Sequence, residues 1–337
     1  MAHDRAMKSL IVAPAWVGDM VMAHSLIQEL SVRNSSVAID VLAPASTSSL
    51  GSRMSEVRDV YTLDVGHGRL GISERLQTAR QLRTQEYDEA YVLPNSWKSA
   101  LIPFFAGIKR RIGWLGEMRY GLLNDARSLD KLALPLMVER FAALSVSKNE
   151  ERFTKPAPNP SLVFDTENRL GLATKYGLAH NGAIALAPGA EFGPAKKWPI
   201  SYFAEVARYC VSKGRQIWLL GSAKDSADCA VIAGEVEGVI DLSGKTSLVD
   251  VVDLISLAEY LVCNDSGLMH VSAALGTKTI AMFGSTTDDF TPPLSSNSRT
   301  LAKSLDCRPC FKRACPLGHL DCLKKLAPQE VISVLDL

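Results

Sequence analysis

Short apolar runs alternate along the chain with longer stretches of helical periodicity. In the first half, strands are predicted at 10–13, 37–42, 60–63 and 90–93, and helices over 20–33 and 73–85. In the second half, strands are predicted at 183–187, 216–220, 239–242, 260–263 and 279–283, and helices near 201–213, 225–237 and 248–258. Because strands separated by helices form βαβ units, the sequence predicts an α/β fold with parallel sheets.

A proline-rich connector separates the two halves. Residues 155–160 have the sequence Lys-Pro-Ala-Pro-Asn-Pro, which favours an extended backbone. We place the domain boundary shortly after it, so that residues 1–170 form one domain and residues 171–337 the other. The expected architecture is two open α/β domains facing each other across a central cleft. In such sheets, ligands bind outside the carboxyl ends of the strands.

The segment 265–270, Asp-Ser-Gly-Leu-Met-His, lies between a predicted strand and a helix that we expect to end at Gly276. A strand, a polar turn and a helix point backbone N–H groups and the positive end of the helix dipole above the sheet, which favours a phosphate. Gly267 leaves room for a ligand, and Asp265 or Ser266 can cap the helix. An ordinary capped helix has the same pattern, so other loops must support the ligand interpretation.

Two further loops of the second half fit a nucleoside diphosphate. The loop 188–199 has two glycines and brings Lys197 next to Trp198, a large anchor for a binding loop, although Lys196 and Lys197 could also be a solvated pair. The loop 221–225, Gly-Ser-Ala-Lys-Asp, follows the next strand. No G-x-G-x-x-G follows the first strand and no G-x-x-x-x-G-K-[ST] occurs, which argues against dinucleotide and P-loop sites. Since there is also no Asp-x-Asp motif, lysines and helix termini would have to stabilise a leaving phosphate.

The first predicted strand is followed by a loop that contains Gly18 and Asp19. Gly18 permits a tight turn, and Asp19 begins a helix at the positive end of its dipole. Asp19 is either a simple helix cap or a carboxylate that accepts a proton from a sugar hydroxyl.

Composition narrows the functional classes. The chain has 337 residues, 47% of them hydrophobic, a net charge of +1 and few aromatic residues, so nothing favours nucleic acid as a partner. No apolar stretch approaches the ~20 residues needed to span a bilayer. The first residues form no signal-peptide core, so we expect a cytoplasmic protein. Seven cysteines, an odd number, favour reduced thiols or metal ligands over a disulfide framework.

The chain resembles the ADP-heptose:lipopolysaccharide heptosyltransferases, which form glycosyltransferase family 9 of the GT-B superfamily. Matching blocks cover most of the chain, at 15–20, 91–100, 113–125, 135–140, 188–199, 221–225, 264–270 and 289–294. Within the family, the blocks Pro-Asn-Ser at 94–96 and Gly-Glu-Met-Arg-Tyr-Gly at 116–121 favour the branch that adds the second heptose. The resemblance implies a GT-B fold, two Rossmann-like domains, with the acceptor held by the first and the nucleotide sugar by the second.

The resemblance also implies an activity and its residues. The reaction would be an inverting, metal-independent transfer of heptose from ADP-heptose to the first heptose of a lipid-linked inner core, with no cofactor. Asp19 would be the general base, and Lys197 would neutralise the leaving diphosphate. The implied donor contacts are Gly189, Glu191, Lys197, Ser222, Lys224, Asp265, Ser266, Gly267 and His270, although His270 could equally be a packing residue. The implied acceptor contacts are Gly18, Asn95, Lys98, Arg119 and Tyr120.

Basic residues surround the apolar run 100–108, namely Lys98, Lys109, Arg110, Arg111 and Arg119. Such a surface suits a phosphorylated lipid acceptor and peripheral contact with the cytoplasmic face of the inner membrane. A buried helix with solvated basic ends is an equally good interpretation of the apolar run. Two other functions also stay open, which are a related transferase with a different acceptor and a non-catalytic sugar-nucleotide or glycolipid binding protein.

Four cysteines are grouped near the end of the sequence, at Cys307, Cys310, Cys315 and Cys322, with His319 among them. Four sulfurs in a short segment could form a structural, tetrahedral zinc site. Because the second pair is not a C-x₂-C knuckle, free or transiently oxidised thiols are the alternative.

Overall fold

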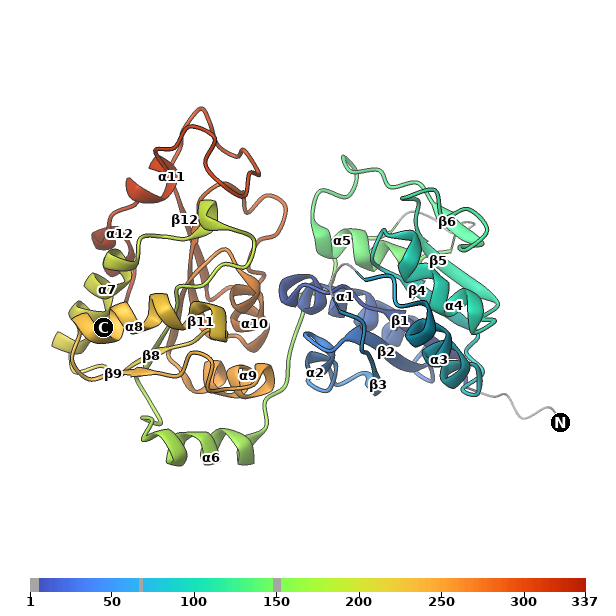
Figure 1. Ribbon diagram of the computed structural model, residues 1–337, viewed down its shortest axis with the longest axis horizontal. Coiled ribbons are helices and arrows are strands. Elements are labelled where there is room, and N and C mark those ends of the chain that lie inside the picture. The colour runs from blue at the N-terminus through green and yellow to red at the C-terminus, as the bar shows by residue number, and fades with distance from the viewer. Residues whose placement is uncertain (1–5, 67–68, 148–152) are drawn as a thin grey trace. The chain divides into compact units, whose positions relative to one another are not determined.

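The computed structural model describes residues 6–66, 69–147 and 153–337. They divide into two compact units, one that ends at Pro160 and one that runs from Ser161 to Leu337. Each unit contains a six-stranded, all-parallel sheet flanked by helices, as the sequence predicts (Figure 1). The boundary that we expected near residue 170 falls inside α6 (Thr166–Tyr176). The side-chain amide of Asn168 donates to Asp253 at 2.7 Å, so α6 is part of the second unit.

The first unit has the sheet order β3-β2-β1-β4-β5-β6. Its strands are β1 (Lys8–Val12), β2 (Ala38–Pro44), β3 (Val57–Leu63), β4 (Glu89–Val92), β5 (Arg110–Trp114) and β6 (Asp125–Arg127). Its helices are α1 (Val17–Arg33), α2 (Ser48–Gly51), α3 (Ile72–Arg83), α4 (Leu101–Phe105) and α5 (Met137–Ala142), with 3₁₀ turns at Trp97–Ala100 and Ala143–Ser145. The predicted strands and helices of this half are all confirmed.

Strands β5 and β6 escaped the sequence analysis because charged residues begin or end them. Arg110 starts β5 and lies 3.2 Å from Asp125, the first residue of β6, and 3.4 Å from Glu89 of β4. Arg127 also contacts Asp125, at 2.9 Å. These ion pairs between neighbouring strands replace the apolar pattern that marks the other strands.

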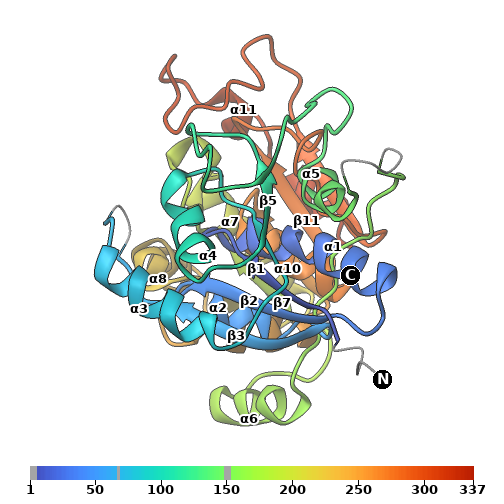
Figure 2. The same ribbon diagram turned by 90° about the vertical axis from the view of Figure 1, so that its right-hand side faces the viewer.

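Two layers of helices cover the first sheet. Leu10 and Val12 of β1 pack with Leu82 of α3 and Ile102 of α4 on one face. Helices α1 and α5 lie on the other face, as Figure 2 shows. Because both faces of the sheet are covered, the consecutive residues Leu10, Ile11 and Val12 of β1 are all apolar and buried.

The second unit has the sheet order β12-β11-β10-β7-β8-β9. Its strands are β7 (Ile184–Ala187), β8 (Ile217–Leu219), β9 (Val239–Asp241), β10 (Tyr260–Asn264), β11 (Lys278–Phe283) and β12 (Ser298–Ala302). Besides α6, its helices are α7 (Ile200–Ser212), α8 (Ser226–Glu235), α9 (Leu248–Leu257), α10 (Gly267–Leu275), α11 (Asp321–Lys324) and α12 (Pro328–Ile332), with 3₁₀ turns at Pro194–Lys196 and Ala223–Asp225. All predicted elements of this half form, and the edge strand β12, which is only partly buried, was not predicted.

A core cluster of the second unit joins α7, α8 and α12 to one face of the sheet. Trp198 is its largest member and is 1% exposed. Its indole N–H donates to the carbonyl of Leu326 at 2.9 Å, and its ring packs edge-on against Phe203 at a centroid distance of 5.0 Å. Trp198 therefore anchors the end of the loop 188–199, as we expected. Helices α9 and α10 cover the opposite face of the sheet (Figure 1).

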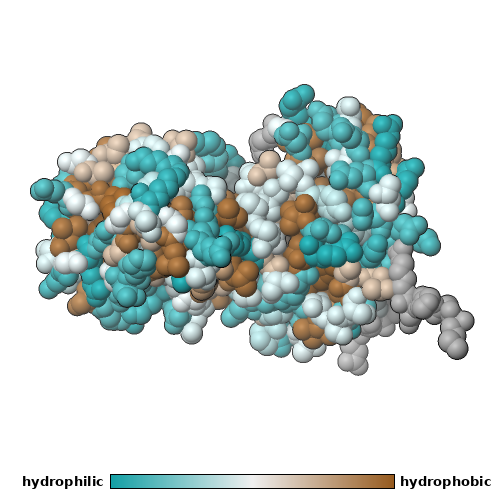
Figure 3. All heavy atoms as spheres, turned by 90° about the horizontal axis from the view of Figure 1, so that it is seen from below, coloured by the Kyte–Doolittle hydropathy of each residue, from teal (hydrophilic) through white to brown (hydrophobic). Residues whose placement is uncertain are grey.

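Hydrophilic and hydrophobic side chains are interspersed over the face drawn in Figure 3. Across the parts of the chain that the structure describes, no helix has both the length and the apolar character needed to cross a bilayer.

Candidate active site

In the second sheet the strand order reverses between β7 and β10. These two strands pair in parallel with Cys263 beside Ala187, so their carboxyl ends lie at the same edge. The chain leaves β7 toward α7 on one face and leaves β10 toward α10 on the other (Figure 1). A crevice at such a switch point is where doubly wound sheets bind their ligands. The loop 188–199 and the start of α10 lie at this switch point.

Asn264, the last residue of β10, connects the loop 188–199 to this strand. Its side chain is fully buried. The amide oxygen accepts from the backbone N–H of Trp198 at 2.9 Å, and the amide nitrogen donates to the carbonyl of Pro188 at 2.7 Å. Both ends of the loop 188–199 are therefore fixed to β10 by one side chain.

Asp265 makes the strongest polar contacts of the site. Its carboxylate lies 2.5 Å from the ammonium of Lys196 and accepts a short hydrogen bond from the hydroxyl of Thr286. Asp265 is 3% exposed, and the Lys196 side chain is 14% exposed. A buried carboxylate requires such partners, because removing it from water is costly. We expected Asp265 or Ser266 to cap the helix, and Asp265 forms this ion pair instead.

Helix α10 begins at Gly267 and ends at Gly276, which adopts the left-handed conformation that we predicted for the helix end. Ser266 occupies the N-cap position, but its side chain makes no capping hydrogen bond. The first N–H groups of α10 therefore lack that side-chain cap, which suits a helix start that receives an anion.

His270 lies in the first turn of α10 and is 7% exposed. Burial lowers the pKa of His270 to about 4; the carboxylate of Asp265 opposes the shift and the ammonium of Lys196 adds to it. The imidazole is therefore neutral at pH 7 and packs beneath the ion pair. Its burial favours the packing role over a direct ligand contact.

Three other predicted donor contacts, Lys197, Ser222 and Lys224, pair with acidic side chains of the second unit. The ammonium of Lys197 lies 2.7 Å from Asp228 of α8, and Lys224 lies 2.6 Å from Glu191. Ser222 donates its N–H and hydroxyl to Asp225, at 3.0 and 2.8 Å.

Gly189 faces the same carboxylate as Ser222. A Cβ atom at Gly189 would lie 2.5 Å from an Asp225 oxygen, so a larger residue here would displace the Asp225 side chain. Gly189 therefore serves the close packing of two loops, and Asp225 is the residue that requires it.

In the first sheet the order reverses between β1 and β4, whose carboxyl ends also lie together, with Val12 beside Val92. The loop after β1 leads into α1, where Gly18 is buried and Asp19 is partly exposed in the first turn. The N-cap of α1 is Trp16, so Asp19 does not occupy the capping position. Its carboxylate stands at the positive end of the helix dipole, at the switch point of the sheet.

Residues 94–98 follow β4, and the loop 115–121 after β5 packs on them. Asn95 and Tyr120 are exposed, and Lys98 is half-buried, as acceptor contacts would need. Arg119 differs, because it is 1% exposed and donates to the carbonyls of Pro94 and Trp114. Burial lowers its pKa to about 10. Arg119 fixes the two loops together from inside, and its buried position does not fit the acceptor contact that we expected.

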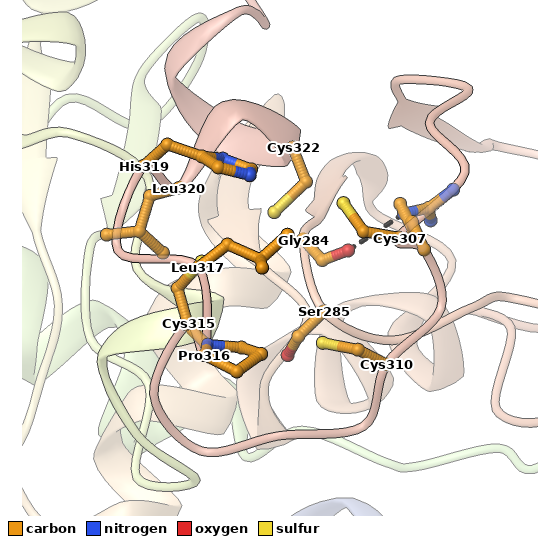
Figure 4. A pocket seen from close by; sticks show the side chains of 12 residues that line it. Gly284, Ser285, Cys307, Cys310, Cys315, Pro316, Leu317, His319, Leu320 and Cys322 are labelled. Atoms are coloured by element: carbon orange, nitrogen blue, oxygen red, sulfur yellow. Dashed lines mark hydrogen bonds between the residues drawn. The ribbon is translucent and has the colours of Figure 1, made fainter.

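The four C-terminal cysteines border one cavity together with Ser285 and His319 (Figure 4). Backbone N–H groups, chiefly that of Leu320, lower the pKa of Cys315. Burial raises the pKa of Cys322, and the neighbouring sulfurs of Cys315, Cys310 and Cys307 raise it further.

Sequence analysis overlooked Lys196, Asn264 and Thr286. Thr286 belongs to the turn Gly284-Ser285-Thr286 after β11, which has the same glycine-containing form as the three loops that were found. Lys196 was passed over in favour of its neighbour Lys197, because sequence alone does not show which lysine of a pair points inward.

Two Rossmann-like units, each with polar loops at the switch point of a parallel sheet, define a GT-B glycosyltransferase. Residues 75–321 match the family model of glycosyltransferase family 9 (heptosyltransferase). The chain belongs to glycosyltransferase family 9.

Similar proteins agree with this assignment. The lipopolysaccharide heptosyltransferase 2 of Salmonella typhimurium and that of Escherichia coli are each 44% identical to the chain over 98% of its length and 97% or 98% of theirs. The solved structure of E. coli ADP-heptose LPS heptosyltransferase II has a TM-score of 0.84 and 42% identity, over 96% of this chain and 100% of that one. A family 9 structure from Veillonella parvula has the same fold, with a TM-score of 0.84 at 18% identity.

The buried His270 makes stability depend on pH. The unfolded chain binds a proton at this histidine below its ordinary pKa of 6.5, whereas the folded chain does so only near pH 4. The free energy of unfolding should thus fall by about 2 kcal/mol between pH 7 and pH 5 through this residue alone. His270→Gln should lose that part of the pH dependence in urea unfolding, and the exposed-site control His180→Gln should retain it. Equal pH dependence in wild type and His270→Gln would contradict the prediction.

Proposed function

We propose that the chain transfers a heptose from ADP-heptose to the first heptose of a lipopolysaccharide inner-core acceptor. The main support is its 44% identity, over nearly the full length, to two proteins named lipopolysaccharide heptosyltransferase 2. The site supports the same reaction class, because a lysine and a helix start lie together at the switch point of the second sheet.

The donor diphosphate, in this proposal, binds at the start of α10 beside Lys196. The ammonium of Lys196 is held there by Asp265, whereas that of Lys197 is turned toward Asp228 on α8. We therefore assign the neutralisation of the leaving diphosphate to Lys196 in place of Lys197. A positive charge at this point stabilises the negative charge that develops as the bond between the sugar and the phosphate breaks.

Asp19 is the proposed general base. Its carboxylate takes the proton of the acceptor hydroxyl as that oxygen attacks the anomeric carbon of the heptose. The new C–O bond forms on the face opposite the bond to ADP, which breaks and releases ADP with both electrons. One displacement of this kind inverts the anomeric centre. The positive end of the α1 dipole favours the negative charge of a carboxylate in this first turn.

Asp19→Asn keeps the size of the side chain and removes its basicity. The turnover of ADP-heptose with a mono-heptosylated acceptor, followed by mass spectrometry, should fall by about 10²- to 10⁴-fold. The affinity for ADP, measured by calorimetry, should stay within twofold because the donor contacts lie in the other unit. Substantial turnover by this variant would remove Asp19 from the base role. ADP release by the wild type that does not depend on the acceptor would argue against transfer itself.

Lys196 and Lys197 form a matched pair for testing the donor site. Lys196→Ala should weaken ADP binding by about ten- to a hundredfold, since it removes a charge-assisted contact to phosphate. Lys197→Ala should change it by less than about threefold, because its ammonium pairs with Asp228 at a partly exposed position. The double variant Lys196→Met/Asp265→Asn leaves no unpaired buried charge, so it separates lost binding from lost folding. The reverse order of the two single variants would contradict the assignment.

We also propose that the first unit contacts an anionic membrane surface where the lipid-linked acceptor lies. Large apolar side chains are exposed in the loops after β4 and β5, with Met118 at 84% and Tyr120 at 68% exposure. Lys98 lies in the 3₁₀ turn that follows β4, and Lys109 directly precedes β5. Arg110 and Arg111, by contrast, are engaged within the unit, with Asp125 and with the carbonyl of Leu122.

The membrane contact predicts a charge-dependent association with vesicles. Lys98→Glu/Lys109→Glu should reduce co-sedimentation with vesicles that contain anionic phospholipid by about tenfold or more. The control Lys175→Glu/Lys213→Glu changes net charge equally on exposed positions of the second unit and should have little effect. Equal losses in both double variants would show only a dependence on net charge, and unchanged binding in the first would contradict the proposal.

A further inference from the structure

The segment 303–322 is an unusual part of the second unit. From Lys303 to Leu320 it forms no helix or strand, and none of its residues up to Cys322 is buried. Loops of more than ~12–15 residues without regular structure are uncommon in compact domains. Burial in an apolar core does not stabilise the conformation of this segment, so another interaction must contribute.

Backbone contacts fix where the segment lies. The guanidinium of Arg308 donates to the carbonyls of Gly284 and Thr286, at 2.8 and 2.9 Å. The N–H of Phe311 donates to the carbonyl of Ser285 at 2.8 Å. These contacts place the segment against the loop after β11, which supplies Thr286 to the donor site.

All four cysteines of the segment border the same cavity, as Figure 4 shows. Cys307 and Cys310 come from one turn with C-x₂-C spacing, Cys315 from a Cys-Pro-Leu-Gly turn, and Cys322 from α11. The segment 307–322 thus brings four thiols to one place. The other cysteines, Cys210, Cys229 and Cys263, are buried singly in the core of the unit.

Ser285 gives an independent indication of a ligand in this cavity. Its side chain is 2% exposed and borders the cavity, yet its hydroxyl oxygen has no hydrogen-bond partner in the structure. A buried hydroxyl without a partner is costly. A metal-bound thiolate beside it would accept its hydrogen bond, as groups around metal ligands commonly do.

All four cysteines of the segment are free thiols in the structure. Free thiols that border one cavity can each supply a thiolate ligand to a metal ion.

We propose that Cys307, Cys310, Cys315 and Cys322 bind one thiophilic divalent metal ion, Zn²⁺, in a tetrathiolate site. As the side chains lie, no group of three or more His, Cys, Asp or Glu residues within the described chain is arranged around a metal position. The four sulfurs therefore have to rotate about their Cα–Cβ bonds into the shared cavity. Four thiols release four protons as Zn²⁺ binds, which leaves a site of net charge −2.

The proposed site would also support the donor loops. The cavity is bordered by Ala195 and Gly284, next to Lys196 in the loop 188–199 and near Thr286. The N–H of Ala195 donates to the carbonyl of Arg313 in the cysteine segment at 3.0 Å. This consequence rests on the proposed function, whereas metal binding itself does not.

The test is metal analysis of the full-length protein purified under reducing conditions. We expect one Zn²⁺ per chain, and replacement by Co²⁺ should give the strong thiolate-to-cobalt absorption of a tetrahedral site. Cys315→Ser and Cys322→Ser should lower the zinc content at least fivefold, and the core control Cys229→Ala should retain it. His319→Ala should also retain it, because the ligand set contains only sulfur.

Several outcomes would overturn the proposal. One is wild-type protein that is folded and binds no metal even after incubation with Zn²⁺. Another is an intact mass lighter by the hydrogens of disulfides formed among these four cysteines. A third is a loss of zinc in His319→Ala. These readouts do not involve ADP or heptose, so they test metal binding even if the proposed transfer reaction is wrong. Because the wild-type protein is also measured, an unstable variant does not prevent a decision.

Discussion

The buried carboxylate of Asp265 is the constraint around which the proposed donor site is built. It needs partners because it lies out of contact with water, and it finds them in Lys196 and Thr286. These residues belong to the loops after β7 and β11, while Asp265 follows β10. One carboxylate thus holds the ends of three strands together, and its neighbour Asn264 fixes both ends of the loop 188–199.

This arrangement prepares the site for an anion without one being bound. The ammonium of Lys196 is kept near the start of α10 by a partner that a phosphate can compete with or join. The neutral His270 beneath the pair adds no charge of its own at pH 7. Folding supplies the free energy needed to bury the ion pair, so ligand binding does not have to supply it.

The fold could be predicted from the sequence because buried parallel strands are short apolar runs separated by helices. Prediction failed where charge or exposure replaced that pattern, as in β5, β6 and β12. The donor loops were found from glycines at strand ends. The sequence did not predict which way individual side chains point. Lys196 and Lys197 have the same chemistry, so sequence alone does not distinguish them. Arg119 is buried by loops that are remote from it in sequence.

A crystal structure of the protein with ADP tests the central claim most directly. The account predicts that the diphosphate lies at the start of α10, with a phosphate oxygen within hydrogen-bond distance of the Lys196 ammonium. A diphosphate bound away from α10, or held by Lys197 while Lys196 stays turned to Asp265 alone, would contradict it.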